Sequence, residues 1–309
     1  MTRAIGIVFG ASTLTVCAGF AFGLAQRSEP PEHGHPPTQT VRTSEAKPEM
    51  RPQKPTGTAE RPPAKPLEIA PRPDAPKAAE PVPAATPAEA LTRLQEGNQR
   101  WVNGKSRNPN TDDARMRAQA EGGQTPFAAI LTCADSRIPV ERVFDCGVGD
   151  IFDVRVAGNI AGPHETGSLE YGAEHLHAPL LVVMGHTRCG AVSAAANDAK
   201  VSGSIPVLLD AIEPAVARAK AQNPSLEGKE LVPAAIKENV WQSVFVLLRS
   251  SEICRERVER GELRIVGAVY NIADGTVEWM GEHPWQSELL AAFRTNQRSA
   301  AASDETDHK

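Results

Sequence analysis

The sequence has no excess of positive charge. It contains 33 Lys and Arg residues against 38 Asp and Glu residues in 309, so its formal net charge is -5 at pH 7. Its isoelectric point is near 6.0. Proteins that bind nucleic acid usually carry a basic patch or stripe that faces the phosphates. The charge balance therefore excludes DNA and RNA from the expected partners.

Cysteine is scarce as well. The chain has five, and if Cys17 is removed with an export signal, the rest remain in the folded domain. Four cysteines in an exported domain could form a disulfide framework in any of three connectivities. A domain of this size, however, buries enough apolar surface to fold without such bridges. We expect Cys146 and Cys254 to be inert thiols, with a disulfide between them as the alternative, and a different role for Cys133 and Cys189.

Charge is absent from residues 4–25, and aromatic residues are absent from residues 27–85. The first stretch follows Arg3 and ends at Gly23-Leu-Ala25, a layout typical of a secretory signal with a small-residue cleavage site. It also approaches the ~20 apolar residues that cross a bilayer, so an uncleaved membrane anchor is the alternative. The second stretch holds most of the 26 prolines, which predicts a disordered linker. Both readings of the leader place the protein outside the cytoplasm, in the periplasm or tethered to a membrane.

A folded domain is predicted to begin at Thr86. Thr86-Pro-Ala-Glu89 has the residues of a helix start, with Thr86 as the cap, proline at the first helical position and Glu89 reaching back. This start divides the chain into a signal peptide or membrane anchor (1–26), a proline-rich disordered linker (27–85), a folded domain (86–295) and a disordered tail (296–309).

Apolar runs alternate with helical patterns through the folded domain. The predicted strands are residues 127–132, 151–156, 180–184, 263–270 and 276–280, and the predicted helices are 87–104, 112–120, 140–144, 165–176, a segment after 189, 206–221 and 232–248. Strands separated by helices imply parallel pairing with right-handed crossovers. Asp274-Gly275 between the last two runs predicts a C-terminal hairpin. The fold class is α/β, a mostly parallel β-sheet flanked by helices.

Two short motifs follow two of these predicted strands. Cys133-Ala-Asp135-Ser-Arg137 comes directly after one apolar run, and His186-Thr-Arg-Cys189-Gly190 comes directly after another. The carboxyl ends of parallel strands are where ligands bind in open α/β sheets. Two thiolates and one imidazole suit Zn²⁺, and three protein ligands leave a fourth position for water, as in catalytic sites. The motifs therefore predict a catalytic zinc site.

The remaining polar residues of these motifs have roles that follow from their chemistry. Cys189 is expected to open a helix, whose dipole favours its thiolate. Asp135 can accept a hydrogen bond from zinc-bound hydroxide, and Arg137 can pair with Asp135 and hold it away from the metal. A purely structural zinc site would need a fourth ligand, for which Asp135 is the nearby candidate.

Together the two motifs resemble those of the β-class carbonic anhydrases, and the likeness runs from about Ala90 to Trp279. The resemblance implies a zinc lyase that interconverts carbon dioxide and bicarbonate and works as a homodimer or multiple of dimers, with a dimerising N-terminal helix. By the family's pattern Gln124 donates a hydrogen bond to bicarbonate, and Gly190 leaves room for substrate. Phe152 and Tyr171 match apolar or aromatic pocket positions, some of which are supplied across the dimer interface.

Some members of that family also adopt a closed state in which the aspartate, here Asp135, binds zinc. Their separate bicarbonate pocket uses a tryptophan where this chain has Ile130, although Arg155 matches the pattern's arginine. We therefore expect a resting site that is predominantly open. Two other functions use the same ligands: a related zinc hydrolase of carbon disulfide or carbonyl sulfide, and an inactive zinc-binding interaction module that acts through the proline tract.

Overall fold

The structure is a computed structural model that describes residues 85–294 of the chain. The predicted leader, the predicted tail and all of the predicted linker except its last residue lie outside the described residues. No helix between residues 85 and 294 is long and apolar enough to cross a membrane.

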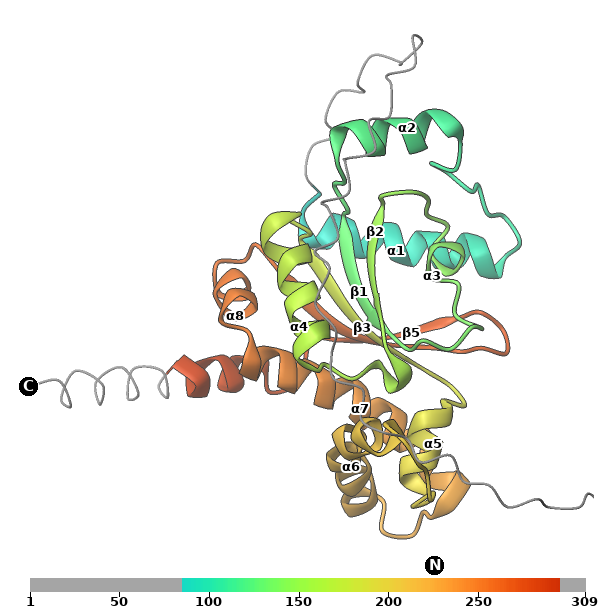
Figure 1. Cartoon of the computed structure of the whole chain (residues 1–309), viewed down its shortest axis with the longest axis vertical. Coiled ribbons are helices and arrows are strands. Elements are labelled where there is room, and N and C mark those ends of the chain that lie inside the picture. The colour runs from blue at the N-terminus through green and yellow to red at the C-terminus, as the bar shows by residue number, and fades with distance from the viewer. Residues whose placement is uncertain (1–84, 295–309) are drawn as a thin grey trace, which may run out of the picture. The chain divides into compact units, whose positions relative to one another are not determined.

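A five-stranded sheet forms the centre of the domain, in the order β2-β1-β3-β4-β5 (Figure 1). The strands β2, β1, β3 and β4 run parallel, and β5 pairs antiparallel with β4. Their bounds are β1 (Ala128–Thr132), β2 (Ile151–Arg155), β3 (Leu180–His186), β4 (Arg264–Tyr270) and β5 (Val277–Gly281). The predicted fold class, with its C-terminal hairpin, is confirmed.

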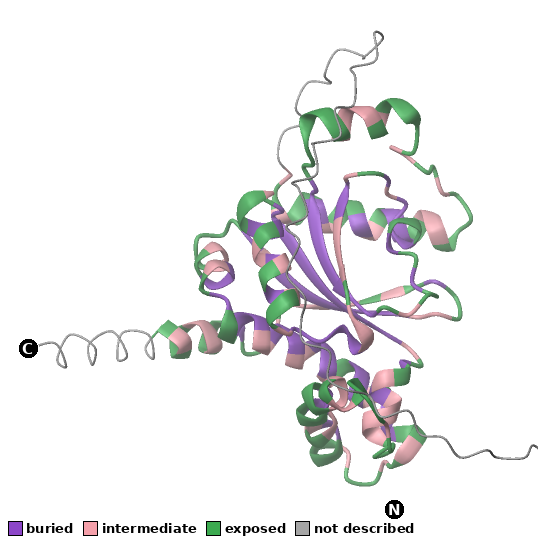
Figure 2. Ribbon diagram, viewed as in Figure 1, coloured by how far each residue is buried: buried purple, intermediate pink, exposed green. Residues whose placement is uncertain are grey.

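The central strands are apolar on both faces because helices cover both faces of the sheet. Every residue of β1 and β3 is buried, as Figure 2 shows for the middle of the sheet. Fully buried parallel strands read as continuous apolar runs rather than alternating ones, which is why they were visible in the sequence. The helices are α1 (Pro87–Val102), α2 (Asp113–Gly122), α3 (Val140–Val143), α4 (Pro163–Glu170), α5 (Gly190–Ala196), α6 (Ile205–Gln222), α7 (Gly228–Ser250) and α8 (Glu252–Glu259), with a 3₁₀ turn at Ala157–Asn159 and a π-helical turn at Tyr171–His175.

The start of α1 follows the predicted capping pattern. The Thr86 hydroxyl accepts a hydrogen bond from the Glu89 N–H at 3.3 Å, and the Glu89 carboxylate accepts one from the Thr86 N–H at 2.8 Å. Further along, a Cβ on Gly97 would lie 1.8 Å from the carbonyl oxygen of Phe144. Glycine is therefore required where α1 meets the chain after α3.

Two helices were not predicted. The helix α8 follows α7 after a single residue, Ser251, whose hydroxyl caps it by accepting a hydrogen bond from the Cys254 N–H at 3.0 Å. Residues 286–294 are also helical. Both are short, and α8 is hidden in the sequence because its cap lies directly at the end of the longer α7.

Candidate metal centre

The three predicted zinc-binding residues lie together at the carboxyl ends of two central strands: Cys133, His186 and Cys189. Their possible ligand atoms all lie within 4.8 Å of one another, and all three residues are buried. Cys133 follows β1, His186 ends β3, and Cys189 immediately precedes α5. Because β1 and β3 are neighbours that run parallel, their carboxyl ends meet. The predicted convergence of the three residues is confirmed.

The ring of His186 is prepared to bind a cation. Its Nδ1 lies 3.0 Å from the carbonyl oxygen of Thr187, which assigns the ring proton to Nδ1 and leaves a lone pair on Nε2. His186 is fully buried, and its Nε2 has no hydrogen-bond partner among residues 85–294. Leaving such an atom unpaired costs about 1–3 kcal/mol. A metal ion bound by Nε2 removes this penalty, so the donor set fits zinc.

Each of the two thiols, Cys133 and Cys189, changes the pKa of the other. A hydrogen bond from the Cys189 thiol, together with one from the Gly158 N–H, lowers the pKa of Cys133 to about 4 against the opposing effect of burial. The neighbouring Cys133 thiolate in turn raises the pKa of the Cys189 thiol. Ionisation of one sulfur thus opposes ionisation of the other, and a bound dication would allow both sulfurs to carry charge.

Asp135 and Arg137 form the predicted pair beside the three ligands. The Arg137 Nε donates to Asp135 Oδ1 at 2.9 Å and its Nη2 donates to Oδ2 at 2.7 Å, and the Arg137 backbone N–H adds a bond of 3.0 Å. These bonds hold the pKa of Asp135 well below its usual range. Asp135 Oδ2 lies 3.9 Å from His186 Nε2. The carboxylate therefore faces the metal centre and at the same time forms an ion pair with Arg137.

Arg155 fixes the loop that carries Cys133 and Asp135. Its guanidinium donates to the carbonyl oxygen of Cys133 at 3.1 and 3.0 Å and to that of Asp135 at 2.6 Å. Ile130 is fully buried within β1 and carries no donor. The Arg155 guanidinium is therefore already hydrogen-bonded to backbone oxygens, and Ile130 offers no donor. Both facts support the expectation that the separate, non-catalytic bicarbonate pocket is incomplete.

The four predicted substrate residues occupy different places. Gly190 begins α5 next to Cys189, and apart from its chain neighbours and the backbone of its own helix nothing lies within 4 Å of where its Cβ would be, so there is open space beside Cys189. Gln124 precedes β1 and lies at the opposite, amino end of the strands from Cys133. Phe152 is the second residue of β2, and the Tyr171 ring lies 6.1 Å from its ring. Gly190 thus lies beside Cys189, and the substrate-binding roles of all four residues stay predictions.

The backbone of Gly158 is a contributor that sequence reasoning missed. Its N–H donates to Cys133 Sγ at 3.3 Å. The signal that could have found it is the Gly158-Asn159 pair just past β2, because both residues have positive φ, at 77° and 44°, and glycine and asparagine adopt that conformation most readily.

The cysteines outside the centre behave as predicted. All four described cysteines are free thiols. Burial raises the pKa of Cys146 to about 12 and that of Cys254 to about 11. Thiols that stay protonated near neutral pH are poor nucleophiles and poor metal ligands, so neither competes with the three-residue site.

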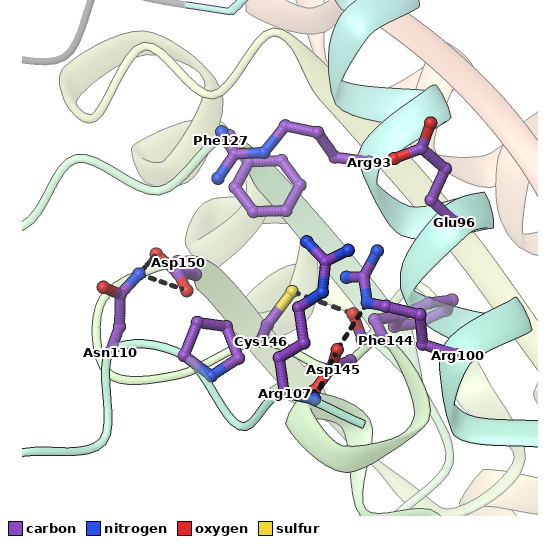
Figure 3. Close-up of a pocket in the computed structure, with 11 residues that line it drawn as sticks. Arg93, Glu96, Arg100, Arg107, Asn110, Phe127, Phe144, Asp145, Cys146 and Asp150 are labelled. Carbon is purple, nitrogen blue, oxygen red and sulfur yellow. Dashed lines mark hydrogen bonds and ion pairs between the residues drawn. The ribbon is translucent and has the colours of Figure 1, made fainter. Parts of the chain in front are cut away.

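A polar cavity of about 230 Å³ lies at the amino end of the sheet, away from the metal centre (Figure 3). Two of its three carboxylates, those of Asp145 and Asp150, already have partners. Asp145 pairs with Arg100 at 2.6 Å and accepts hydrogen bonds from backbone N–H groups of the loop after α1. Both carboxylate oxygens of Asp150 accept a hydrogen bond from Asn110 Nδ2. These charges anchor the loop between α1 and α2 to the rest of the domain.

Comparison with known proteins adds the family context. A family model described as carbonic anhydrase matches residues 128–277, which include the three clustered residues of the candidate metal centre, Asp135 and Arg137. Carbonic anhydrase 2 of Mycobacterium tuberculosis is 36% identical over 198 residues, 63% of this chain and 93% of its own length. The carbonic anhydrase of Mycolicibacterium smegmatis is 34% identical over 201 residues, 64% of this chain and 95% of its own.

A solved structure shares the fold. A β-carbonic anhydrase of Aspergillus fumigatus aligns with a TM-score of 0.55 at 23% identity, over 67% of this chain and 97% of the other. At that identity the likeness concerns the fold.

Proposed function

The chain belongs to the carbonic anhydrase family, and from that premise we propose that its Cys133, His186 and Cys189 hold Zn²⁺ for the interconversion of carbon dioxide and bicarbonate. The observation that carries the assignment is the buried Nε2 of His186, which lies within 4.8 Å of two cysteine sulfurs and has no hydrogen-bond partner in the described part of the chain. The protein is a zinc-dependent carbonate dehydratase.

Held by Cys133, His186 and Cys189, zinc would supply a Lewis acid that acidifies water near neutral pH. The residues of the chain orient the reaction. The ionised Asp135 accepts a hydrogen bond from the attacking oxygen, which turns the oxygen lone pair toward the carbon of carbon dioxide. Arg137 keeps that carboxylate charged and off the metal. The hydration of one carbon dioxide molecule consumes one water and releases bicarbonate and a proton, which passes to solvent buffer.

A structural zinc module is the weaker candidate. Structural zinc sites have four protein ligands. The three residues at this centre would need Asp135 as the fourth, but both of its oxygens are engaged by Arg137. A coordination position is therefore left for water or substrate.

The family resemblance also supports a homodimer, or a multiple of dimers, in which Gln124, Phe152 and Tyr171 complete the partner's site. Their position toward the amino ends of the strands supports a contribution across the interface rather than within one chain. Gln124→Ala should lose about a hundredfold in turnover, the effect of removing one donor to a developing negative charge. Cys133→Ser should be inactive.

Mixing these two variants under conditions of subunit exchange tests the arrangement. Each mixed dimer would have one working site, in which the zinc ligands of one subunit face the intact Gln124 of the other. About half of the dimers would be mixed after random exchange, so roughly a quarter of wild-type activity should return. If mass analysis shows that mixed dimers form and activity stays at the level of the parents, Gln124 does not act across the interface.

Export is the proposed location of the enzyme, with residues 4–25 as a cleaved signal or as a membrane tether. The uncharged stretch followed by a long hydrophilic tract supports it. Alkaline phosphatase, which folds only after export, should be active when fused after residue 85 and inactive when residues 4–25 are deleted. Equal activity of a cytosolic reporter in both fusions would contradict export, and the soluble or membrane fraction distinguishes cleavage from anchoring.

A further inference from the structure

The Gly158 N–H that reaches Cys133 belongs to a backbone with little conformational preference of its own. Gly158 lies in the 3₁₀ turn after β2 with φ at 77°, and its N–H donates to Cys133 Sγ at 3.3 Å. A glycine populates positive and negative φ about equally, so its local chemistry does not fix this direction. Something outside the turn must hold the N–H on the sulfur.

Helix α7 contacts this turn from a distant part of the chain, and one of its two bonds is made to Gly158 itself. The Asn239 Nδ2 donates to the carbonyl oxygen of Gly158 at 2.7 Å, and the Ser243 hydroxyl donates to that of Asn159 at 2.8 Å. Both side chains are almost fully buried, at 1% and 2% exposure. They are four residues apart and so lie on one face of the helix.

Of the two polar atoms of the Asn239 side-chain amide, only the donor nitrogen makes a hydrogen bond. Its Oδ1 is buried and has no hydrogen-bond partner between residues 85 and 294, whereas its Nδ2 faces a carbonyl oxygen. The contact with a carbonyl also assigns which end of the amide is nitrogen. An apolar residue of the same size would fill this space without an unpaired oxygen. The residue is therefore not explained by packing.

We infer that Asn239 is a positioning residue for the metal centre, which acts by holding Gly158 so that its N–H donates to the Cys133 thiolate. An N–H bond to a ligating sulfur draws charge away from it and leaves the metal more electrophilic. Two thiolates would otherwise neutralise most of the charge of the dication. The inference rests on the proposed function only in that Cys133 must be a metal ligand.

The test compares Asn239→Leu with Ser243→Ala in the full chain loaded with Co²⁺ or Zn²⁺. Asn239→Leu removes the donor at nearly constant volume. Ser243→Ala removes a similar bond from the same helix face, one residue farther from Cys133. The sulfur-to-cobalt charge-transfer band reports the charge on the thiolates directly, which a general loss of stability would not move.

Asn239→Leu should shift that band to lower energy, weaken zinc binding in chelator competition by about tenfold or more, and lower kcat with little change in KM. The Gly158 amide should also exchange faster with deuterated solvent. Ser243→Ala should keep the wild-type band. If Asn239→Leu does not fold, Asn239→Ala, which cannot overfill the space, carries the same expectations.

An unchanged band and unchanged zinc affinity in the folded Asn239 variants would overturn the inference. Equal shifts in the Asn239 and Ser243 variants would also overturn it, because the effect would then be general to the turn. Wild-type protein that binds neither metal would instead reject the proposed function itself, so the two failures are distinguishable.

Discussion

Cys133→Ala is expected to leave the protein without zinc and with less than about 1% of wild-type carbon dioxide hydration. Loss of a partner that merely supports a ligand already costs about 10–100-fold in metal affinity or activity, and loss of a ligand itself is more severe. His186→Ala and Cys189→Ala should behave alike, since each leaves two protein ligands at a site whose atoms lie within 4.8 Å.

The matched control is Cys254→Ala. Cys254 is as deeply buried as the ligands, but burial holds its pKa near 11 and it lies outside the three-residue cluster. Its replacement should lower the melting temperature while zinc content and turnover per folded chain stay at wild-type values. Stopped-flow hydration and metal analysis of each variant check this. Full activity in a ligand variant that has lost zinc would show that these residues only pack the core.

Asp135→Asn is expected to keep zinc and lose about a hundredfold or more in kcat. A carboxylate that orients a proton in the transition state contributes about 10²–10⁴-fold, and an amide can present a donor where an acceptor is needed. Arg137→Ala should lose turnover for a second reason. Asp135 Oδ2 is already 3.9 Å from His186 Nε2, so without Arg137 the carboxylate is free to occupy the open metal position.

An exposed ion pair of the same sequence spacing provides the control for this pair. Arg260 and Glu262 are bonded at 3.0 Å on the surface, away from the metal centre. Exposed pairs contribute little, so Glu262→Gln should change neither zinc content nor kcat. Wild-type turnover in Asp135→Asn would mean that Asp135 and Arg137 are likewise only a surface pair.

The centre was predictable because its parts are local in sequence. Each motif follows a strand that is buried on both faces and therefore reads as an unbroken apolar run. Parallel neighbours bring their carboxyl ends together, so two local patterns sufficed to place Cys133 beside His186 and Cys189. The Thr86 cap was readable for the same reason, since both of its bonds join it to Glu89, three residues away.

The support around the centre was not predictable because it joins distant segments. The bond from Asn239 to Gly158 spans 81 residues, and its acceptor is a backbone carbonyl, which any residue possesses. Arg155 likewise binds the carbonyl oxygens of Cys133 and Asp135, which leave no mark on the sequence. A buried asparagine within α7 has no local pattern that separates it from a solvent-facing one.

The central claim is that zinc at the Cys133, His186 and Cys189 centre carries out carbon dioxide hydration. Zinc content and stopped-flow hydration should be measured on one preparation of the full chain, before chelation, after chelation and after zinc is restored. The account predicts about one zinc per chain, activity that falls in proportion to the zinc removed, and recovery when zinc returns. Hydration activity that survives complete removal of zinc, or a full complement of zinc without hydration, would contradict it.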